Sequence, residues 1–290
     1  MEKYLDAFLN AFKGSLDWTL KMITFDVPWY MNFFYGLLLI SLVVWALELA
    51  FPWRKQQKAI RKDFWLDGFY MFFNFFVFSV AIAGIYALIG VFNESYGLTM
   101  KSFALFDISA WAMGWQLLLF FVVLDFVQWV THVALHRWEF LWRFHQVHHS
   151  VEEMGFAAHL RYHWMENIFY KPLKTLGVML IGGFEPEQAY VVHFVAITIG
   201  HLNHANVHIT WGPLKYVFNN SVMHLWHHVY DLPKGFKHGI NFGISLSLWD
   251  YIFKTASIPK DDGNIRLGYP GVEKMPKTFF GQLTYGFRKD

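Results

Sequence analysis

Fifteen histidines and no cysteine occur in this chain of 290 residues. Eight of the histidines fall into three short boxes with a related spacing, namely H-x-x-x-H at 132–136 and H-x-x-H-H at both 145–149 and 224–228. Residues three and four apart share a helix face, so each box aims two or three imidazoles at one point. Neutral imidazole binds iron, zinc, copper or nickel, and the lack of cysteine excludes thiolate ligands. The pattern therefore predicts a nitrogen-ligated metal site.

The number of these imidazoles predicts more than one metal ion. They are His132, His136, His145, His148, His149, His224, His227 and His228. Since one ion takes only about four to six ligands, two ions are the natural expectation. Asp125 lies about two helical turns before His132, on the same face. We expect its carboxylate to orient a ligating imidazole, although contact with water at the helix end is an equal alternative.

Long apolar segments must position these boxes. Three of them cover residues 31–53, 68–93 and 108–124, and the last continues as a helix towards His136. A segment of this kind can cross a hydrocarbon core of about 30 Å. Two weaker stretches, 168–184 and 188–206, would either span or re-enter. We therefore expect an all-α integral membrane protein with about three to five transmembrane helices. Large buried core helices are the disfavoured alternative.

Composition and charge agree with a membrane protein. Hydrophobic residues make up 55% of the chain and charged residues 16%, which excludes a disordered chain. The net charge of +2, without a basic stripe, argues against a nucleic-acid partner. Residues 1–26 carry apolar side chains at helical spacing and are expected to form an interfacial helix, not a cleavable signal peptide.

The basic residues predict the orientation in the membrane. Lysine and arginine accumulate on the cytosolic side of membrane proteins. We therefore place the loop between the first two spans, and with it the three boxes, on the cytosolic face as a histidine-rich helical cap. The basic residues of that loop are Arg54, Lys55, Lys58, Arg61 and Lys62.

The boxes on a multi-span chain resemble those of the fatty acid hydroxylase/sterol desaturase superfamily, whose members are membrane di-iron oxygenases. The resemblance covers roughly residues 110–258. Beyond the boxes it includes Asp125 ahead of the first, the element R-x-H-x-x-E at 161–166, H-A-N at 204–206, N-F-G at 241–243 and W-D-x-x-F at 249–253. Lys254 stands where relatives often have glycine.

This resemblance implies a chemistry and a larger site. It implies two iron ions, O2 as co-substrate, and hydroxylation or desaturation of a C–H bond in a fatty-acyl, sterol or ether lipid. No catalytic residue is expected beyond the metal ligands. His163 and His204 become additional ligands. Residues expected to support the ligands are Asp125, Glu166, His201, Asn206 and Asp250.

We expect one integrated domain in three parts. Residues 1–109 would hold the interfacial helix and two spans, 110–258 the catalytic region and 259–290 a C-terminal tail. No segment resembles a cytochrome b5 haem motif, so electrons are expected from a separate ferredoxin or cytochrome b5-like protein with its reductase. The short chain favours a bacterial inner membrane over the endoplasmic reticulum. The oligomeric state stays open.

Two other classes of metal protein remain as alternatives. A haem electron carrier uses one histidine from each of two facing helices and does not need clustered boxes. A metal transporter places its ligands near the bilayer midplane at broken helices. The boxes here fall at the ends of apolar segments, which favours the oxygenase.

Overall fold

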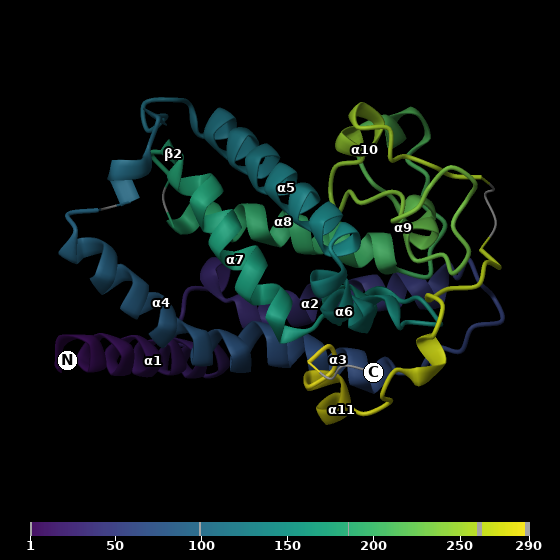
Figure 1. Ribbon diagram of the computed structural model, residues 1–290, viewed down its shortest axis with the longest axis horizontal. Coiled ribbons are helices and arrows are strands. Elements are labelled where there is room, and N and C mark those ends of the chain that lie inside the picture. The colour runs from purple at the N-terminus through teal and green to yellow at the C-terminus, as the bar shows by residue number, and fades with distance from the viewer. Residues whose placement is uncertain (1, 99, 185, 260–262, 288–290) are drawn as a thin grey trace.

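Helices account for most of the chain in the computed structural model, which describes residues 2–98, 100–184, 186–259 and 263–287 (Figure 1). The α-helices are α1 (Glu2–Ile23), α2 (Phe33–Ala50), α3 (Phe64–Phe72), α4 (Phe78–Ser95), α5 (Met113–Arg137), α6 (Glu139–His149), α7 (Trp164–Met179), α8 (Pro186–His204), α9 (Ser221–His227), α10 (Leu248–Ile252) and α11 (Phe279–Leu283). The strands are β1 (Phe106–Asp107) and β2 (Ile181–Gly182), and the shorter helical segments are η1 (Trp29–Met31), η2 (Phe73–Val77), η3 (Met100–Phe103), η4 (Phe156–Leu160), η5 (Gly212–Tyr216) and η6 (Val272–Lys274).

Three helical stretches are long and apolar enough to cross a membrane. They are α2, the continuous helix Phe64–Ser95, which comprises α3, η2 and α4, and α5. A helix satisfies its own backbone polar groups, which lipid cannot do. The predicted all-α class with three spanning segments is therefore confirmed. The third segment begins at Met113 and not at residue 108, because the Asp107 side chain accepts a hydrogen bond from the Ser109 backbone in a local turn.

The helix Phe64–Ser95 contains a π-helical segment, η2, at its middle. Such a bulge changes the direction in which nearby side chains point, and it is often found at functional sites. Here Asn74 lies within the bulge and is buried. Its amide donates to the backbone oxygens of Leu160 and Tyr162. The bulge therefore ties the second spanning helix to the segment that precedes α7.

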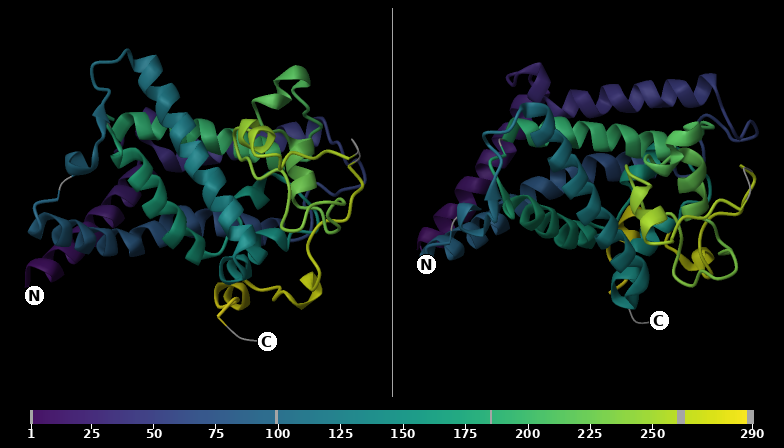
Figure 2. Two further views of the ribbon diagram at one scale, coloured as in Figure 1. Left: turned by 45° about the horizontal axis from the view of Figure 1, so that its top comes forward. Right: turned by 90° about the horizontal axis from the view of Figure 1, so that it is seen from above.

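The N-terminal helix α1 packs against another helix of the fold. It packs against α4 (Figure 2). The ring of Phe8 fills the space left by the missing side chain of Gly84, where an added Cβ would lie 2.5 Å from the ring. The predicted helix near the N-terminus is present, and its apolar face is partly covered by α4.

The three boxes lie at one end of the helices. α5 and α8 run side by side towards the end where α6, α9 and α10 gather (Figure 1). The first box ends α5, the second ends α6, and the third lies in α9 and the residue after it. At the opposite end of α7 and α8, β2 pairs in parallel with β1. The long helices thus place all three boxes together, as their positions in the sequence require.

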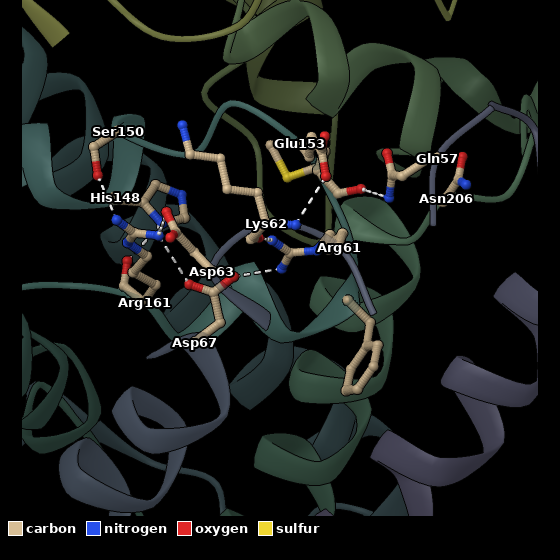
Figure 3. A network of polar contacts seen from close by, with 12 residues as sticks. Gln57, Arg61, Lys62, Asp63, Asp67, His148, Ser150, Glu153, Arg161 and Asn206 are labelled. Carbon is tan, nitrogen blue, oxygen red and sulfur yellow. Dashed lines mark hydrogen bonds and ion pairs between the residues drawn. The ribbon is translucent and has the colours of Figure 1, made fainter. Parts of the chain in front are cut away.

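A buried ion network fixes the start of α3 to the second box (Figure 3). The Arg161 guanidinium contacts Asp63 and Asp67, each at 3.1 Å, and donates to Ser150 Oγ at 2.9 Å. Arg61 forms a second ion pair with Asp67. The Asp67 side chain is fully buried, and the Arg61 and Arg161 side chains are nearly so. Because charges are costly to bury alone, each group in this network depends on its partners.

Replacing Asp67 by alanine should therefore destabilise the protein by about 3–5 kcal/mol, because two buried guanidinium groups lose a shared carboxylate. The measurement is the free energy of unfolding in mixed detergent micelles. The matched control is Glu152→Ala, which breaks an exposed ion pair with Lys62 in the same region and should cost less than about 1 kcal/mol. Equal small losses in both variants would show that the network is not a structural anchor.

Candidate metal centre

The three boxes converge on two adjacent clusters of buried histidines. The larger cluster takes residues from all three boxes, and one ring nitrogen from each member lies within 4.8 Å of those of the others. Its members are His132, His136, His145, His149 and His227. Two of them come from α5, two from α6 and one from α9, so the cluster exists only when these three helices are assembled.

The second cluster has four members and touches the first. Its members are His148, His204, His224 and His228, and their ligand atoms obey the same 4.8 Å limit. His204, at the end of α8, adds a residue from outside the boxes. The ring centroids of His149 and His228, one from each cluster, lie 4.3 Å apart. The structure thus brings together nine of the ten predicted ligands. They form two groups, which fits the expectation of two metal ions.

Hydrogen bonds at Nδ1 fix which nitrogen of each ring is free. In the larger cluster, the Nδ1 atoms of His132, His136 and His227 contact backbone carbonyls at 2.7, 3.1 and 2.8 Å. A carbonyl can only accept, so each Nδ1 carries the proton. In a neutral ring, Nε2 then carries the lone pair that binds metal. The Nδ1 atoms of His148 and His204 contact carbonyls in the same way in the second cluster.

The free nitrogens face one another at short range. His132 Nε2 lies 3.1 Å from His145 Nε2, and His136 Nε2 lies 3.1 Å from His149 Nε2. The Nδ1 of His145 contacts the Glu166 carboxylate at 2.9 Å, so His145 also directs its Nε2 into the cluster. The Nε2 of His227 is buried and has no hydrogen-bond partner among the residues that the structure describes. Facing lone pairs and an unpartnered nitrogen fit a cation held between them.

Burial keeps the imidazoles in the form that binds metal. It lowers the pKa of His145, His149 and His227 well below the usual value, and neighbouring histidines lower it further. Burial likewise lowers the pKa of His148, to about 3. These rings are therefore neutral near pH 7, as metal ligation requires.

The structure does not place His163 in either cluster, which differs from the expectation that it is a ligand. Its Nδ1 accepts from the backbone N–H of Met165, and its Nε2 donates to the backbone oxygen of Leu283. Together with Glu166 it forms a capping box at the start of α7. Both ring nitrogens are used in these bonds, so His163 joins α7 to the C-terminal segment.

Asp125 and Asp250 hold a backbone loop and do not contact a ring of the clusters. Asp125 accepts from the backbone N–H groups of Ser245 and Leu246 and from Trp249, which corrects the expectation that it orients an imidazole. Asp250 accepts from the N–H groups of Phe242 and Gly243. Because the Phe242 carbonyl fixes His132, both acids support the metal centre through this loop.

Glu166 and Asn206, two other predicted supporting residues, have different partners. Glu166 contacts His145 directly and satisfies the prediction geometrically. Asn206 bonds instead to both backbone groups of Arg54, and its own N–H donates to Glu48. It therefore anchors the loop after α2 and does not contact a cluster.

His159 is a neighbour of the second cluster that the sequence pattern did not single out. Its ring centroid lies 5.0 Å from that of His204, and its Nδ1 is 2.9 Å from His201 Nδ1. His201 in turn contacts Ser41 at 3.1 Å and reaches His204 through His159. Gly200 provides the space, because a Cβ there would lie 2.2 Å from the His159 ring. In the sequence, the one feature that reflects this contact is Gly200, four residues before His204.

A cavity of about 530 Å³ opens onto both clusters. His132 and His145 of the larger cluster and His148 and His204 of the second line one end of it. This volume lies within the usual range of about 300–1,000 Å³ for sites that bind small ligands. The clusters are therefore accessible to a molecule inside the protein.

Comparison with known proteins agrees with this geometry. Residues 117–255 match the family model "Fatty acid hydroxylase", so this segment of the chain is similar to that family. The match confirms the resemblance predicted for residues 110–258 and contains the three boxes. No solved structure matches the chain significantly.

The curated relatives are enzymes that act on lipids. Ornithine lipid hydroxylase OlsE from Rhizobium tropici is 31% identical over 179 residues, which are 62% of this chain and 52% of that protein. Human alkylglycerol monooxygenase is 27% identical over 248 residues, covering 79% of this chain and 48% of that protein. The Caenorhabditis elegans alkylglycerol monooxygenase is 26% identical over 156 residues. The chain spans about half the length of the first two relatives.

Glu166→Ala should weaken metal binding by about 10–100-fold, because His145 loses the acceptor that holds its ring. Glu166→Gln keeps an acceptor oxygen and should lose less. The measurement is iron per chain after equilibration with a competing chelator. Glu139→Ala, an exposed position on α6, is the control and should match the unchanged protein. Equal iron retention in all three variants would contradict the role given to Glu166.

Proposed function

We propose that the protein is a membrane-bound, non-haem di-iron enzyme that uses O2 to oxidise a C–H bond of a lipid. The observation that carries this proposal is the pair of buried histidine clusters, four members of which line a cavity. Nine neutral imidazoles and few nearby carboxylates form a donor set suited to iron. The match to the fatty acid hydroxylase family supports iron over the other metals that imidazole binds.

When bound, the two iron ions would supply the redox chemistry by which O2 and two electrons oxidise the substrate carbon. In addition to this redox chemistry, the reaction needs three contributions from the residues of this chain. The backbone carbonyls and Glu166 hold the imidazole rings in place. The cavity would position one carbon of the lipid beside the clusters, and its largely apolar wall would limit the access of water. No side-chain nucleophile is required.

The names of the relatives support a lipid substrate. One is named an ornithine lipid hydroxylase and others alkylglycerol monooxygenases. Fatty-acyl, sterol and ether lipids are the classes that we propose, with hydroxylation favoured over desaturation because both names describe oxygen insertion. The three apolar helices give the enzyme direct access to such molecules.

The electrons would come from a separate ferredoxin or cytochrome b5-like protein and its reductase. We place the clusters on the cytosolic face, because the basic loop that follows α2 lies on their side of the spanning helices. In this orientation a soluble donor reaches the metal centre from the cytosol. A bacterial inner membrane is favoured over the endoplasmic reticulum.

Removing one ligand from each cluster tests the metal assignment. His227→Ala and His148→Ala should each lower bound iron by about one ion per chain, because each removes a ligand from a different cluster. Iron is measured by mass spectrometry on purified protein. His163→Ala is the matched control, since it removes a buried histidine outside the clusters and should retain both ions. Unchanged iron in the first two variants would exclude the two-cluster assignment.

Lipid analysis of cells tests the reaction. Cells that express the protein should contain a lipid heavier by one oxygen atom than its precursor. The species should be absent when His227→Ala is expressed at the same level. A species lighter by two hydrogens would indicate desaturation instead. An unchanged lipid profile, with iron bound and an electron donor present, would contradict the proposed activity.

A further inference from the structure

The cavity that meets the clusters continues far from the metal centre. Its wall follows α8 from His204 back to Ala189, a distance of about 22 Å at 1.5 Å per residue. Trp18 and Met22 of α1 also line the cavity. The cavity is therefore long enough to hold one part of a lipid beside the metals and another part well away from them.

Two lysines lie in the wall of this cavity. Lys171 and Lys174 are three residues apart in α7, so their side chains share one face of the helix. Both retain accessible surface although the helix is packed on several sides. His193 of α8 lines the same cavity and interacts electrostatically with both. Two cations in one wall form a concentration of positive charge inside an otherwise apolar part of the protein.

The described residues provide these ammonium groups with few partners. Lys171 Nζ donates to Ser79 Oγ at 3.1 Å and lies 5.7 Å from the Phe78 ring. Lys174 Nζ lies 5.5 Å from the Tyr170 ring. Among the residues that the structure describes, neither lysine has a carboxylate within 4.0 Å. A partly buried charge without a counter-charge is unfavourable, so a ligand that supplies one would be stabilised.

The nearest acids have other partners. Glu166 is the one acidic side chain in the described lining, and it bonds to His145 and to the backbone of His163. Asp125 attracts Lys174 from a greater distance, but its oxygens accept from the 245–249 loop. The cavity thus has two lysines for one acid, and that acid supports the metal centre.

We propose that Lys171 and Lys174 bind an anionic group, a carboxylate or a phosphate, that is part of the lipid substrate. This inference rests on the proposed function and specifies its substrate class. The two lysines lie five and eight residues after Glu166, about 8 and 12 Å along α7. The anionic group is held at that depth while the hydrocarbon chain extends to the clusters. The oxidised carbon is therefore several bonds away from the charge.

Binding of three probes with the same chain tests the proposal. Palmitic acid, hexadecyl phosphate and hexadecanol differ only in the head group, which is a carboxylate, a phosphate or a neutral hydroxyl. Affinities are measured on the full-length, iron-loaded protein in a nonionic detergent, under argon and without an electron donor. The unchanged protein should bind each anionic probe at least about tenfold more tightly than hexadecanol. Equal affinities would overturn the proposal, whatever the variants show.

Variants locate the charge. Lys174→Met and Lys171→Met keep the apolar stem, and each should weaken binding of both anionic probes by about tenfold while leaving hexadecanol within about twofold. Lys174→Arg retains the charge and should retain most of the affinity. Lys234→Met, at an exposed position, is the matched control. Anion preference that survives the double variant Lys171→Met/Lys174→Met would overturn the assignment.

A further arm distinguishes a lipid-borne anion from a free one. Millimolar inorganic phosphate should not displace palmitic acid, because it lacks the chain that fills the cavity. Displacement would indicate a site for a free anion and would overturn the proposal. Binding needs no turnover, so these results are separate from the proposed oxidation. If the protein binds palmitic acid and hexadecyl phosphate through Lys174 but oxidises no lipid, only the proposed oxidation is contradicted.

Discussion

Nine imidazoles buried within a few ångströms of one another are the constraint on which the rest of this structure depends. Neutral rings whose Nδ1 atoms are bonded to carbonyls must point their Nε2 lone pairs at one another. Those lone pairs cannot be satisfied by each other, and His132 and His145 approach to 3.1 Å at these atoms. Cations between the rings would remove this conflict, so metal binding would be coupled to the folded arrangement.

The carbonyls that orient the rings must themselves be held, which explains the position of several polar groups in an apolar protein. Phe242 provides the carbonyl for His132, and its own N–H is bound by Asp250. Gly243 follows, where a Cβ would lie 2.3 Å from the backbone oxygen of Leu246, so that the loop can turn closely. Asp125 fixes the same loop from α5. A carboxylate in a spanning helix thus supports a ligand through two intermediate groups.

The sequence predicted the parts of the site that depend on local periodicity. The boxes share a helix face at a spacing of three and four residues, and the apolar segments show their length directly. It predicted poorly what depends on contacts between distant segments. His163 belongs to a motif shared with the family that the chain resembles. Its Nε2, however, donates a hydrogen bond to the backbone oxygen of Leu283, which is far along the chain. His159 had no periodic signal, because a short helical segment and the absent side chain of Gly200 place it beside His204.

The weak hydropathy of α7 and α8 has the same physical origin as the cavity. Lys171 and Lys174 interrupt the first of these helices, which has 16 residues, and His193 and His204 interrupt the second. Neither helix is among the three that are long and apolar enough to cross a membrane. All four residues line the cavity that leads to the clusters. Polar groups in a membrane protein are stable where they face a protein interior or a cavity and not lipid. The departure of this hairpin from a clean apolar pattern therefore marks the wall of the cavity.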